Sequence, residues 1–302
     1  MITKLFDIQR RVVAHKTVES WETIPHAGAV IELDVTAVDS FIQKMRKHPD
    51  YSDVHLTVNS VMLKIIAESI KTSPELNAHI EYNRSNSVGS IHLLDTIDIA
   101  IPMMTPEKKM ITPVLRDVAG KSLHEVCRAA AILKERAQKT NVDLLLYEAS
   151  RDDSLKRLRK GQVLSVLWRV WSNHIAPKRI VMPSKAERTA YYKIPDTERL
   201  TASDLLNASA IVSNVGSLMP KLNCHVALLE IIAPAILAIG IAAAQKQPVV
   251  ETDKNGVDQV IIRKIMKFTV YFDHRALDGA HFFSFVEHLQ ELCAAPEKLV
   301  QQ

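Results

Sequence analysis

The chain has 302 residues, of which 47% are hydrophobic and 24% charged, enough for one large domain or two ordinary ones with a sizeable core. Its net charge of +4 is spread along the chain, so composition gives no indication of nucleic-acid binding. The three cysteines form no CxxC pair, which argues against a disulfide framework and a metal site. The opening MITKLFDIQRR has no apolar core of a secretion signal, so we expect a cytoplasmic protein.

Apolar periodicity predicts a mixture of strands and helices. In chain order it predicts a strand at 27–36, a helix at 57–70, strands at 90–93, 97–103 and 111–115, a helix at 122–139, strands near 209–213, 226–241 and 259–272, and a closing helix from about 280 to 294. Thr57 and Ser122 occupy N-cap positions of the first two helices. Because the elements follow no regular βαβ rhythm, the sequence predicts an α/β fold with a mixed sheet.

Residues 226–243, VALLEIIAPAILAIGIAA, approach the length of a transmembrane helix. Glu230 and Pro234 interrupt this apolar run near its middle. We therefore interpret it as two buried strands, or a strand pair around a bend, and expect no membrane span here.

A segment at about 148–199 differs from the rest in combining two tryptophans, Trp168 and Trp171, with a cluster of cations. Its apolar side chains are too dense for a solvated helix. The favoured interpretation is a helix that packs on its own domain or on an oligomer partner. Contact with a membrane surface through residues 155–175, or a lid over an acyl-binding pocket, are the alternatives.

Five further segments occur in one order: TIPHAGAVIELDVT at 23–36, LTVNSVMLKIIAESIKTSPELNAHI at 56–80, ITPVLRDVAGKSL at 111–123, IVSNVG at 211–216, and FDHRALDGAHFFSFVEHLQELCAAPEKLV at 272–300. Together they resemble the motifs of the catalytic domain of dihydrolipoyl acyltransferases, the core component of 2-oxo-acid dehydrogenase complexes. The resemblance implies one chloramphenicol-acetyltransferase-like catalytic domain over residues 1–302, a mixed sheet with flanking helices that forms trimers, with the 148–199 segment as an insert.

The chain departs from the family pattern at three places. No lipoyl domain or subunit-binding domain precedes the core. The 148–199 insert replaces the family's short link between the helix at the KSL motif and the ISNLG strand. Residues 230–233 read EIIA where the family has NPPQ. We therefore expect a stand-alone acyltransferase rather than a complete dehydrogenase-complex component.

The resemblance assigns the chemistry to two residues. His274, in DHRxxDG, is the general base, because a neutral imidazole is well matched to take the proton of a thiol. Ser213, in IVSNVG, stabilises the tetrahedral oxyanion, and Asn214 supports it. In a trimer, His274 of one chain would face Ser213 of its neighbour. The acyl group would pass directly between coenzyme A and a thiol acceptor, with no acyl-enzyme, no covalent cofactor and no metal.

The remaining motif residues are expected to be structural. The resemblance implies that Asp278 is a brace of the histidine loop, paired with Arg10 or Arg11 near the N-terminus. A buried carboxylate would need such a partner. Arg275 and Asp273 are expected to shape the loop, and Gly279 to permit the turn into the closing helix.

Several alternatives remain open. The acceptor can be a lipoyl or acyl-carrier protein in trans, a small thiol, an amine or a hydroxyl. A non-catalytic trimeric scaffold of the same fold, assembled further into a cubic shell or not, is the rival from another class. A peptide-bond-forming condensation domain is disfavoured, because Asp273 stands where that family has a first histidine. A Cys224 nucleophile and lipoylation of Lys254, which lies in a predicted hairpin turn, are also disfavoured.

Overall fold

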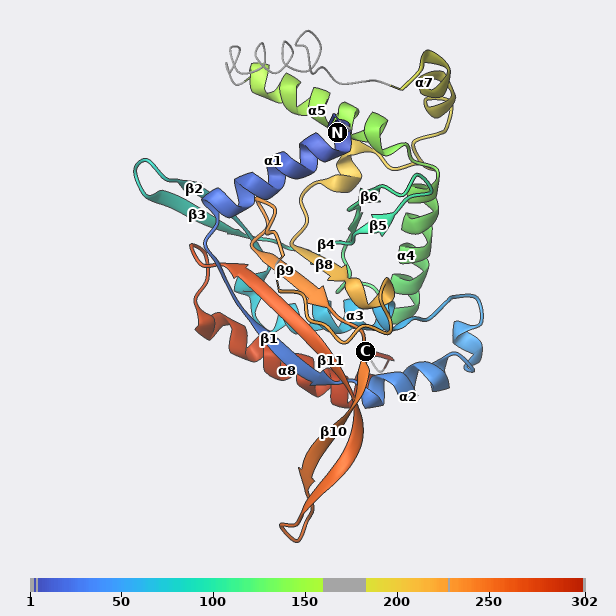
Figure 1. Cartoon of the computed structure of the whole chain (residues 1–302), viewed down its shortest axis with the longest axis vertical. Helices are drawn as coiled ribbons and strands as arrows, with labels where there is room; N and C mark the ends of the chain where they lie inside the picture. Colours follow the sequence, from blue (N-terminus) through green and yellow to red (C-terminus); the bar gives the residue numbers. More distant parts are fainter. Residues whose placement is uncertain (1–2, 4, 160–182, 228, 301–302) are drawn as a thin grey trace. The chain divides into compact units, whose positions relative to one another are not determined.

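The computed structural model describes residues 3, 5–159, 183–227 and 229–300 (Figure 1). The chain divides into two units. The first comprises Met1–Glu19, Met103–Pro113 and Ile132–Leu206, and the second comprises Ser20–Pro102, Val114–Ala131 and Asn207–Gln302. The tryptophans of the expected insert, Trp168 and Trp171, lie outside the described residues.

The second unit is built on a seven-stranded mixed sheet, as the sequence predicts. Its order is β1 (His26–Asp34), β11 (Asp258–Asp273), β9 (Leu237–Ile241), β8 (Ala210–Asn214), β4 (Ile99–Ala100) and β7 (Val114–Leu115), with β10 (Gln245–Thr252) paired to β11. Strands β4, β8 and β9 are mutually parallel, and the other pairs are antiparallel. The predicted strands at 97–103 and 111–115 are each split in two, at Pro102 and Pro113, because proline cannot donate to a strand ladder.

Three helices pack with this sheet: α2 (Thr36–Met45), α3 (Val58–Lys71) and α8 (Phe283–Ala294). Helix α3 is almost wholly buried, which agrees with its apolar spacing, and a capping box between Thr57 and Ser60 fixes its start. Helix α8 contacts β1 and α3 (Figure 1). Phe268, Val270 and Phe285 are fully buried, so the main core lies in this unit.

The prediction of two strands, or a strand pair around a bend, within 226–241 is wrong, because among the residues described there only Leu237–Ile241 form a strand, β9. The preceding residues are irregular and cover the sheet instead: Tyr271 on β11 donates to the carbonyl of Ala227 (2.6 Å), and Val226 packs over Gly240. Strand β9 is buried throughout, so its apolar run resembles that of the covering segment. Among the described residues, no helix is long and apolar enough to cross a membrane.

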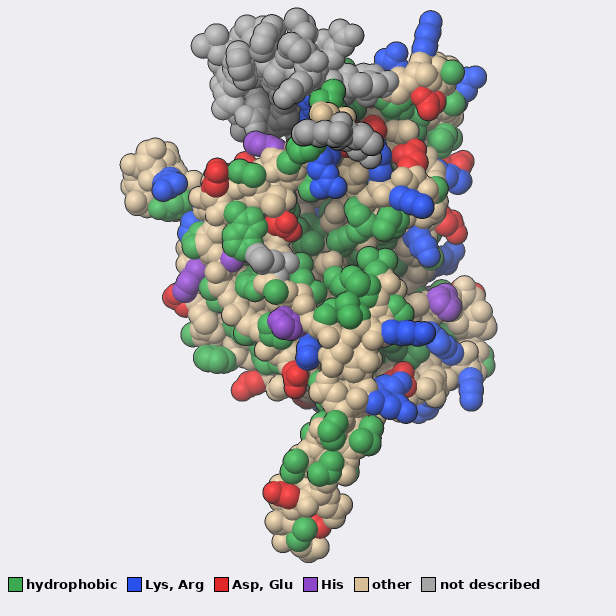
Figure 2. Space-filling model, viewed as in Figure 1, with side chains coloured by type: hydrophobic (Ala, Val, Ile, Leu, Met, Phe, Trp, Pro, Cys, Tyr) green, Lys and Arg blue, Asp and Glu red, His purple; other side chains and the backbone are tan. Residues whose placement is uncertain are grey.

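Two hairpins project from the second unit (Figure 1). One joins β2 (Ala78–Asn83) and β3 (Val88–Leu93) as a separate two-stranded sheet. The other is the outer part of β10 and β11, closed by a turn at Asp253–Gly256, as predicted around Lys254. Figure 2 shows apolar side chains along this second hairpin; those most exposed are Val250, Val257, Val260 and Ile262.

The first unit contains most of α1 (Ile8–Thr23), the hairpin of β5 (Met103–Met104) and β6 (Met110–Ile111), the end of α4 (Leu123–Gln138), α5 (Val142–Arg159) and α7 (Lys185–Tyr191). Helix α4 confirms the prediction at 122–139, and Ser122 caps it by accepting from the Glu125 N–H. Short 3-10 turns complete the chain at Pro49–Tyr51, Pro74–Leu76, Ala202–Leu205, Val215–Ser217, Gly279–Phe282 and Pro296–Val300.

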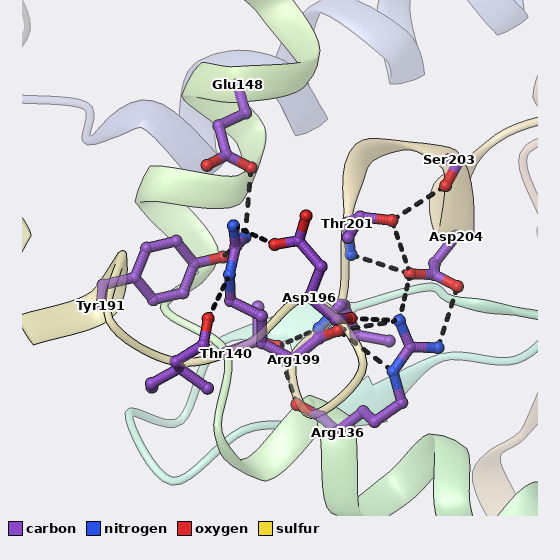
Figure 3. A network of polar contacts seen from close by, with 11 residues as sticks. Arg136, Thr140, Glu148, Tyr191, Asp196, Arg199, Thr201, Ser203 and Asp204 are labelled. Atoms are coloured by element: carbon purple, nitrogen blue, oxygen red, sulfur yellow. Dashed lines mark hydrogen bonds and ion pairs between the residues drawn. The ribbon is translucent and has the colours of Figure 1, made fainter.

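A polar network connects the elements on either side of residues 160–182 (Figure 3). Arg199, which is 7% exposed, donates to the Tyr191 hydroxyl (3.0 Å) and to Glu148 on α5 (3.3 Å) and pairs with Asp196 (2.6 Å). Arg136 on α4 donates to the carbonyl of Arg199 (2.8 Å), so α4, α5 and α7 are held together by buried charge-assisted bonds.

Candidate active site

His274 lies on the loop that follows β11. Backbone bonds fix the start of this loop: the Asp273 N–H donates to the carbonyl of Ile236 and the His274 N–H to that of Pro25, both at 2.9 Å. The imidazole Nδ1 lies 2.8 Å from the carbonyl oxygen of Leu277. Because a carbonyl oxygen can only accept, Nδ1 carries the proton, and Nε2 of the neutral ring is free to take one. The side chain is 52% exposed, so Nε2 can be reached from solvent.

A buried ion pair between Asp273 and Arg275 stabilises the same loop. Asp273 is 0% exposed and accepts from Nε (2.9 Å) and Nη2 (2.5 Å) of Arg275. Its backbone carbonyl accepts from the N–H groups of Ala276 (3.0 Å) and Leu277 (3.1 Å). The Arg275 guanidinium also lies over the Tyr82 ring of β2, 5.4 Å from its centre. These bonds place the Leu277 carbonyl where it meets the His274 ring.

The expectation that Asp278 is buried is wrong, because its side chain is 80% exposed and needs no partner for solvation. Its Oδ1 lies 3.7 Å from Nδ1 of His274, farther than the Leu277 carbonyl. Arg10 and Arg11 lie on α1 in the first unit, where the Arg10 N–H donates to Asp7 (2.8 Å).

The role expected for Gly279 is also corrected. Its backbone is not in the left-handed region, and a Cβ there would meet no atom within 4 Å. The turn into the 3-10 segment Gly279–Phe282 therefore does not require glycine.

Ser213 lies half-buried near the end of β8, beside Gly240 of β9. The next residue, Asn214, accepts from the Ser217 N–H (3.0 Å) and donates to Oδ1 of Asn59 in the first turn of α3 (3.0 Å). Sequence reasoning missed Asn59. Its only signal in the sequence is an amide side chain in the first turn of helix α3.

Strand register separates Ser213 from His274. Ser213 pairs with Gly240, and Gly240 pairs with Thr269 on β11. His274 lies five residues beyond Thr269, so the two residues are about 16 Å apart along the strands and about 10 Å apart across them. One chain therefore brings His274 together with Asp273, Arg275 and Asp278 but keeps Ser213 out of hydrogen-bond reach.

The cysteines offer no competing nucleophile in the core. Burial raises the pKa of Cys293 to about 12 and also raises the pKa of Cys127, so both remain protonated thiols at neutral pH. Cys224 lies in the irregular segment that precedes β9. In the part of the chain that the structure describes, no three His, Cys, Asp or Glu side chains are grouped to hold a metal ion.

His26 is held by a ring contact and by hydrogen bonds at both ring nitrogens. Its ring stacks on Trp21 with centroids 4.7 Å apart, and its Nδ1 lies 2.8 Å from the Ile24 carbonyl. Its Nε2 accepts from the Ile231 N–H (3.2 Å), and this bond joins β1 to the segment before β9.

Comparison with known proteins agrees with the fold. The core of the pyruvate dehydrogenase multienzyme complex, a cubic assembly, superposes with a TM-score of 0.68 at 19% identity, over 99% of this chain and 94% of that one. An acetyltransferase component of this complex from Neurospora crassa is 23% identical over 96% of this chain and 48% of its own length. The mouse pyruvate dehydrogenase protein X component is 29% identical over 43% of this chain and 24% of its own length.

The chain thus spans no more than about half the length of these two curated relatives. The sequence model of the 2-oxoacid dehydrogenases acyltransferase (catalytic domain) family matches residues 4–144 and 181–301, which is most of the chain and leaves 145–180 unmatched. This chain therefore belongs to the family of 2-oxoacid dehydrogenase acyltransferase catalytic domains.

Proposed function

We propose that the protein transfers an acyl group between coenzyme A and a thiol acceptor, at a site made by His274 of one chain and Ser213 of another. The observation that carries the proposal is the 2.8 Å contact between Nδ1 of His274 and the Leu277 carbonyl. It fixes the tautomer that a general base needs, with Nε2 unprotonated on a side chain that is half-exposed. Family membership supports the reaction class, and the acceptor is a dihydrolipoyl group in free form or on a carrier protein.

In the proposed reaction, Nε2 of His274 takes the proton of the attacking thiol. The resulting thiolate adds to the thioester carbonyl carbon, and the carbonyl oxygen becomes an oxyanion. The Ser213 hydroxyl of the second chain donates a hydrogen bond to that oxyanion, which is worth about 3 kcal/mol of barrier in comparable sites. Collapse of the intermediate breaks the original carbon–sulfur bond, and the departing thiolate recovers the proton from Nε2.

Two chains are required because of the strand register. Within one chain Ser213 is two strands away from β11 and level with Thr269, five residues before His274, so a second copy must supply the missing half of each site. The insert at 148–199 is proposed as an addition to this single catalytic domain. The family model leaves residues 145–180 unmatched, which supports an insert there, but it does match residues 181–199.

Thiol release from acetyl-coenzyme A in the presence of dihydrolipoamide tests the proposal. His274→Ala should lower kcat at least about 1,000-fold, and Ser213→Ala about 100-fold. Mixing the two inactive variants, with time to exchange subunits, should restore part of the activity, because some mixed interfaces carry both intact residues. Full activity in His274→Ala would show that the chain does not use this base.

The acceptor is tested in the same assay. The protein could show no activity with dihydrolipoamide but His274-dependent activity toward an amine, a hydroxyl or another thiol. That result would support an acyltransferase and reject the lipoyl group as its acceptor. Failure of wild-type protein with all acceptors would favour a scaffold of the same fold.

A further inference from the structure

His274 contacts an aromatic ring as well as the Leu277 carbonyl. The ring of Phe272 lies 5.9 Å from the imidazole, centroid to centroid, with the two planes at 83°. Aromatic rings in proteins prefer such edge-to-face arrangements at centroid distances of about 4.5–7 Å. The hydrogen bond at Nδ1 fixes one atom of the imidazole but leaves the ring free to turn about that bond. A perpendicular ring packed against the imidazole limits that rotation.

Phe272 is itself fixed in place. It lies one residue before the end of β11 and pairs with Ala27 of β1 on one side and Leu237 of β9 on the other. Its side chain is 5% exposed and lies on the same face of the strand as the buried Phe268 and Val270. Because the backbone is paired on both sides and the ring is enclosed, Phe272 forms a rigid wall for the imidazole.

Two further rings support Phe272. Phe282, in the 3-10 turn that follows the His274 loop, lies 6.2 Å from Phe272, and Phe285 on α8 lies 5.6 Å from Phe282, centroid to centroid. Phe285 is fully buried. We call Phe272, Phe282 and Phe285 the aromatic row. The row connects the strand before the His274 loop to the helix after it, so the core holds both ends of the loop.

We infer that Phe272 is a positioning residue for His274, and that its ring prevents the imidazole from rotating about the bond at Nδ1. The Leu277 carbonyl selects the tautomer, and Phe272 selects the direction in which Nε2 points. The inference rests on the role proposed above for His274 as the general base. A bound thiol gives up its proton only when Nε2 faces it, so loss of the ring should lower kcat and leave substrate binding unchanged.

Phe272→Leu in the thiol-release assay tests the inference. Leucine keeps the apolar character of the position but has no flat ring. We therefore expect kcat to fall about 10-fold while KM stays within about twofold of wild type. Phe272→Tyr keeps the ring and should retain kcat within about threefold of wild type.

Phe268→Leu is the matched control. Phe268 is fully buried on the same face of β11 and lies about 13 Å before Phe272 along the strand, farther from the imidazole. Both leucine variants should lose stability in urea titrations, because each removes buried aromatic area, but only Phe272→Leu should lose kcat. Equal losses of kcat in the two folded variants would assign the effect to a general loosening of the core and contradict the inference.

Double variants test whether the effect passes through His274. Phe272→Leu should add no loss to the residual rate of His274→Ala, because the group that it positions is gone. Phe282→Leu should lower kcat about threefold by itself and add nothing in the Phe272→Leu background, because it reaches the imidazole only through Phe272. If Phe272→Leu slows His274→Ala by a further factor of about 10, Phe272 acts on something other than the base and the inference is wrong.

The inference and the proposed function fail separately. Full activity in His274→Ala rejects the base and with it the proposed function. Loss of activity in His274→Ala, together with wild-type kcat in folded Phe272→Leu, keeps the base and rejects the positioning role. Circular dichroism checks that each variant is folded, and Phe272→Met replaces Phe272→Leu if the latter unfolds.

Discussion

The carbonyl oxygen of Leu277 lies 2.8 Å from Nδ1 of His274, whereas the nearer carboxylate oxygen of Asp278 lies 3.7 Å away. The backbone therefore sets the tautomer of the ring, and Asp278 acts on it mainly through its charge. Because that carboxylate is largely exposed, water and salt screen its effect.

Asp278→Asn is expected to leave kcat within about threefold of wild type, because the Leu277 carbonyl, and not this exposed carboxylate, holds Nδ1 of His274. Asp258→Asn, at the distant end of β11, is the matched control and should equal wild type in the same assay. A loss of kcat of about 100-fold in Asp278→Asn alone would show that the carboxylate, rather than the backbone, orients the ring.

Breaking the Asp273–Arg275 pair should lower kcat, because the pair shapes the loop that brings the Leu277 carbonyl to the His274 ring. Arg275→Met and Asp273→Asn should each lower kcat about 10-fold or more by displacing the ring from its catalytic position. The double variant should recover part of the lost stability, because it leaves neither charge buried without its partner.

Arg263→Met controls for simple loss of an arginine from β11. Arg263 pairs with Glu251 and Asp34 at the far end of the strand, so its removal should leave kcat unchanged. Breaking the buried pair also costs about 3–5 kcal/mol of stability. Wild-type kcat in a folded Arg275→Met variant would show that the pair does not position His274.

Tyr191 should make the protein sensitive to alkali. Burial raises the pKa of Tyr191 to about 12, above its ordinary value of 10.0. The folded state therefore prefers the neutral hydroxyl, and about 2 kcal/mol of stability present below pH 10 is lost as pH rises toward 12. Tyr191→Phe should lose stability at pH 8, where the bond to Arg199 is removed, but show a flatter decline above pH 10 in urea titrations.

Tyr82→Phe is the control for that measurement, since its ring is 42% exposed. It should leave the alkaline decline of wild type unchanged. An equally steep decline in Tyr191→Phe would assign the alkaline sensitivity to another group.

The sequence predicted the parts of the fold that have a strong periodic signal. Helix α3 is apolar at helical spacing and is capped by Thr57, and the structure confirms both. Helix α1 was missed because its apolar residues do not share one face, so periodicity gave no helical signal. The segment before β9 was misjudged because burial against a sheet and burial within a sheet both select an unbroken apolar run.

The site was predictable in its residues but not in its arrangement. The motif around His274 gave the base, yet the bond to Leu277 depends on how the loop closes over Asp273, which no local pattern encodes. The distance between Ser213 and His274 follows from the register of β8, β9 and β11, which is a property of long-range pairing. Asn59 was missed for the same reason, because its partner Asn214 is distant in sequence.

Asn59→Ala should lower kcat about 10-fold through Ser213. The amide of Asn59 accepts from Asn214 (3.0 Å), and that bond holds the end of β8 that carries the serine. Its loss costs about 1 kcal/mol and lets the hydroxyl move away from the oxyanion, while substrate binding and KM change little. In the Ser213→Ala background the same substitution should have almost no further effect on kcat, because the group that it positions is already gone. A full additional 10-fold loss in that background would show that Asn59 acts on catalysis by a route other than Ser213.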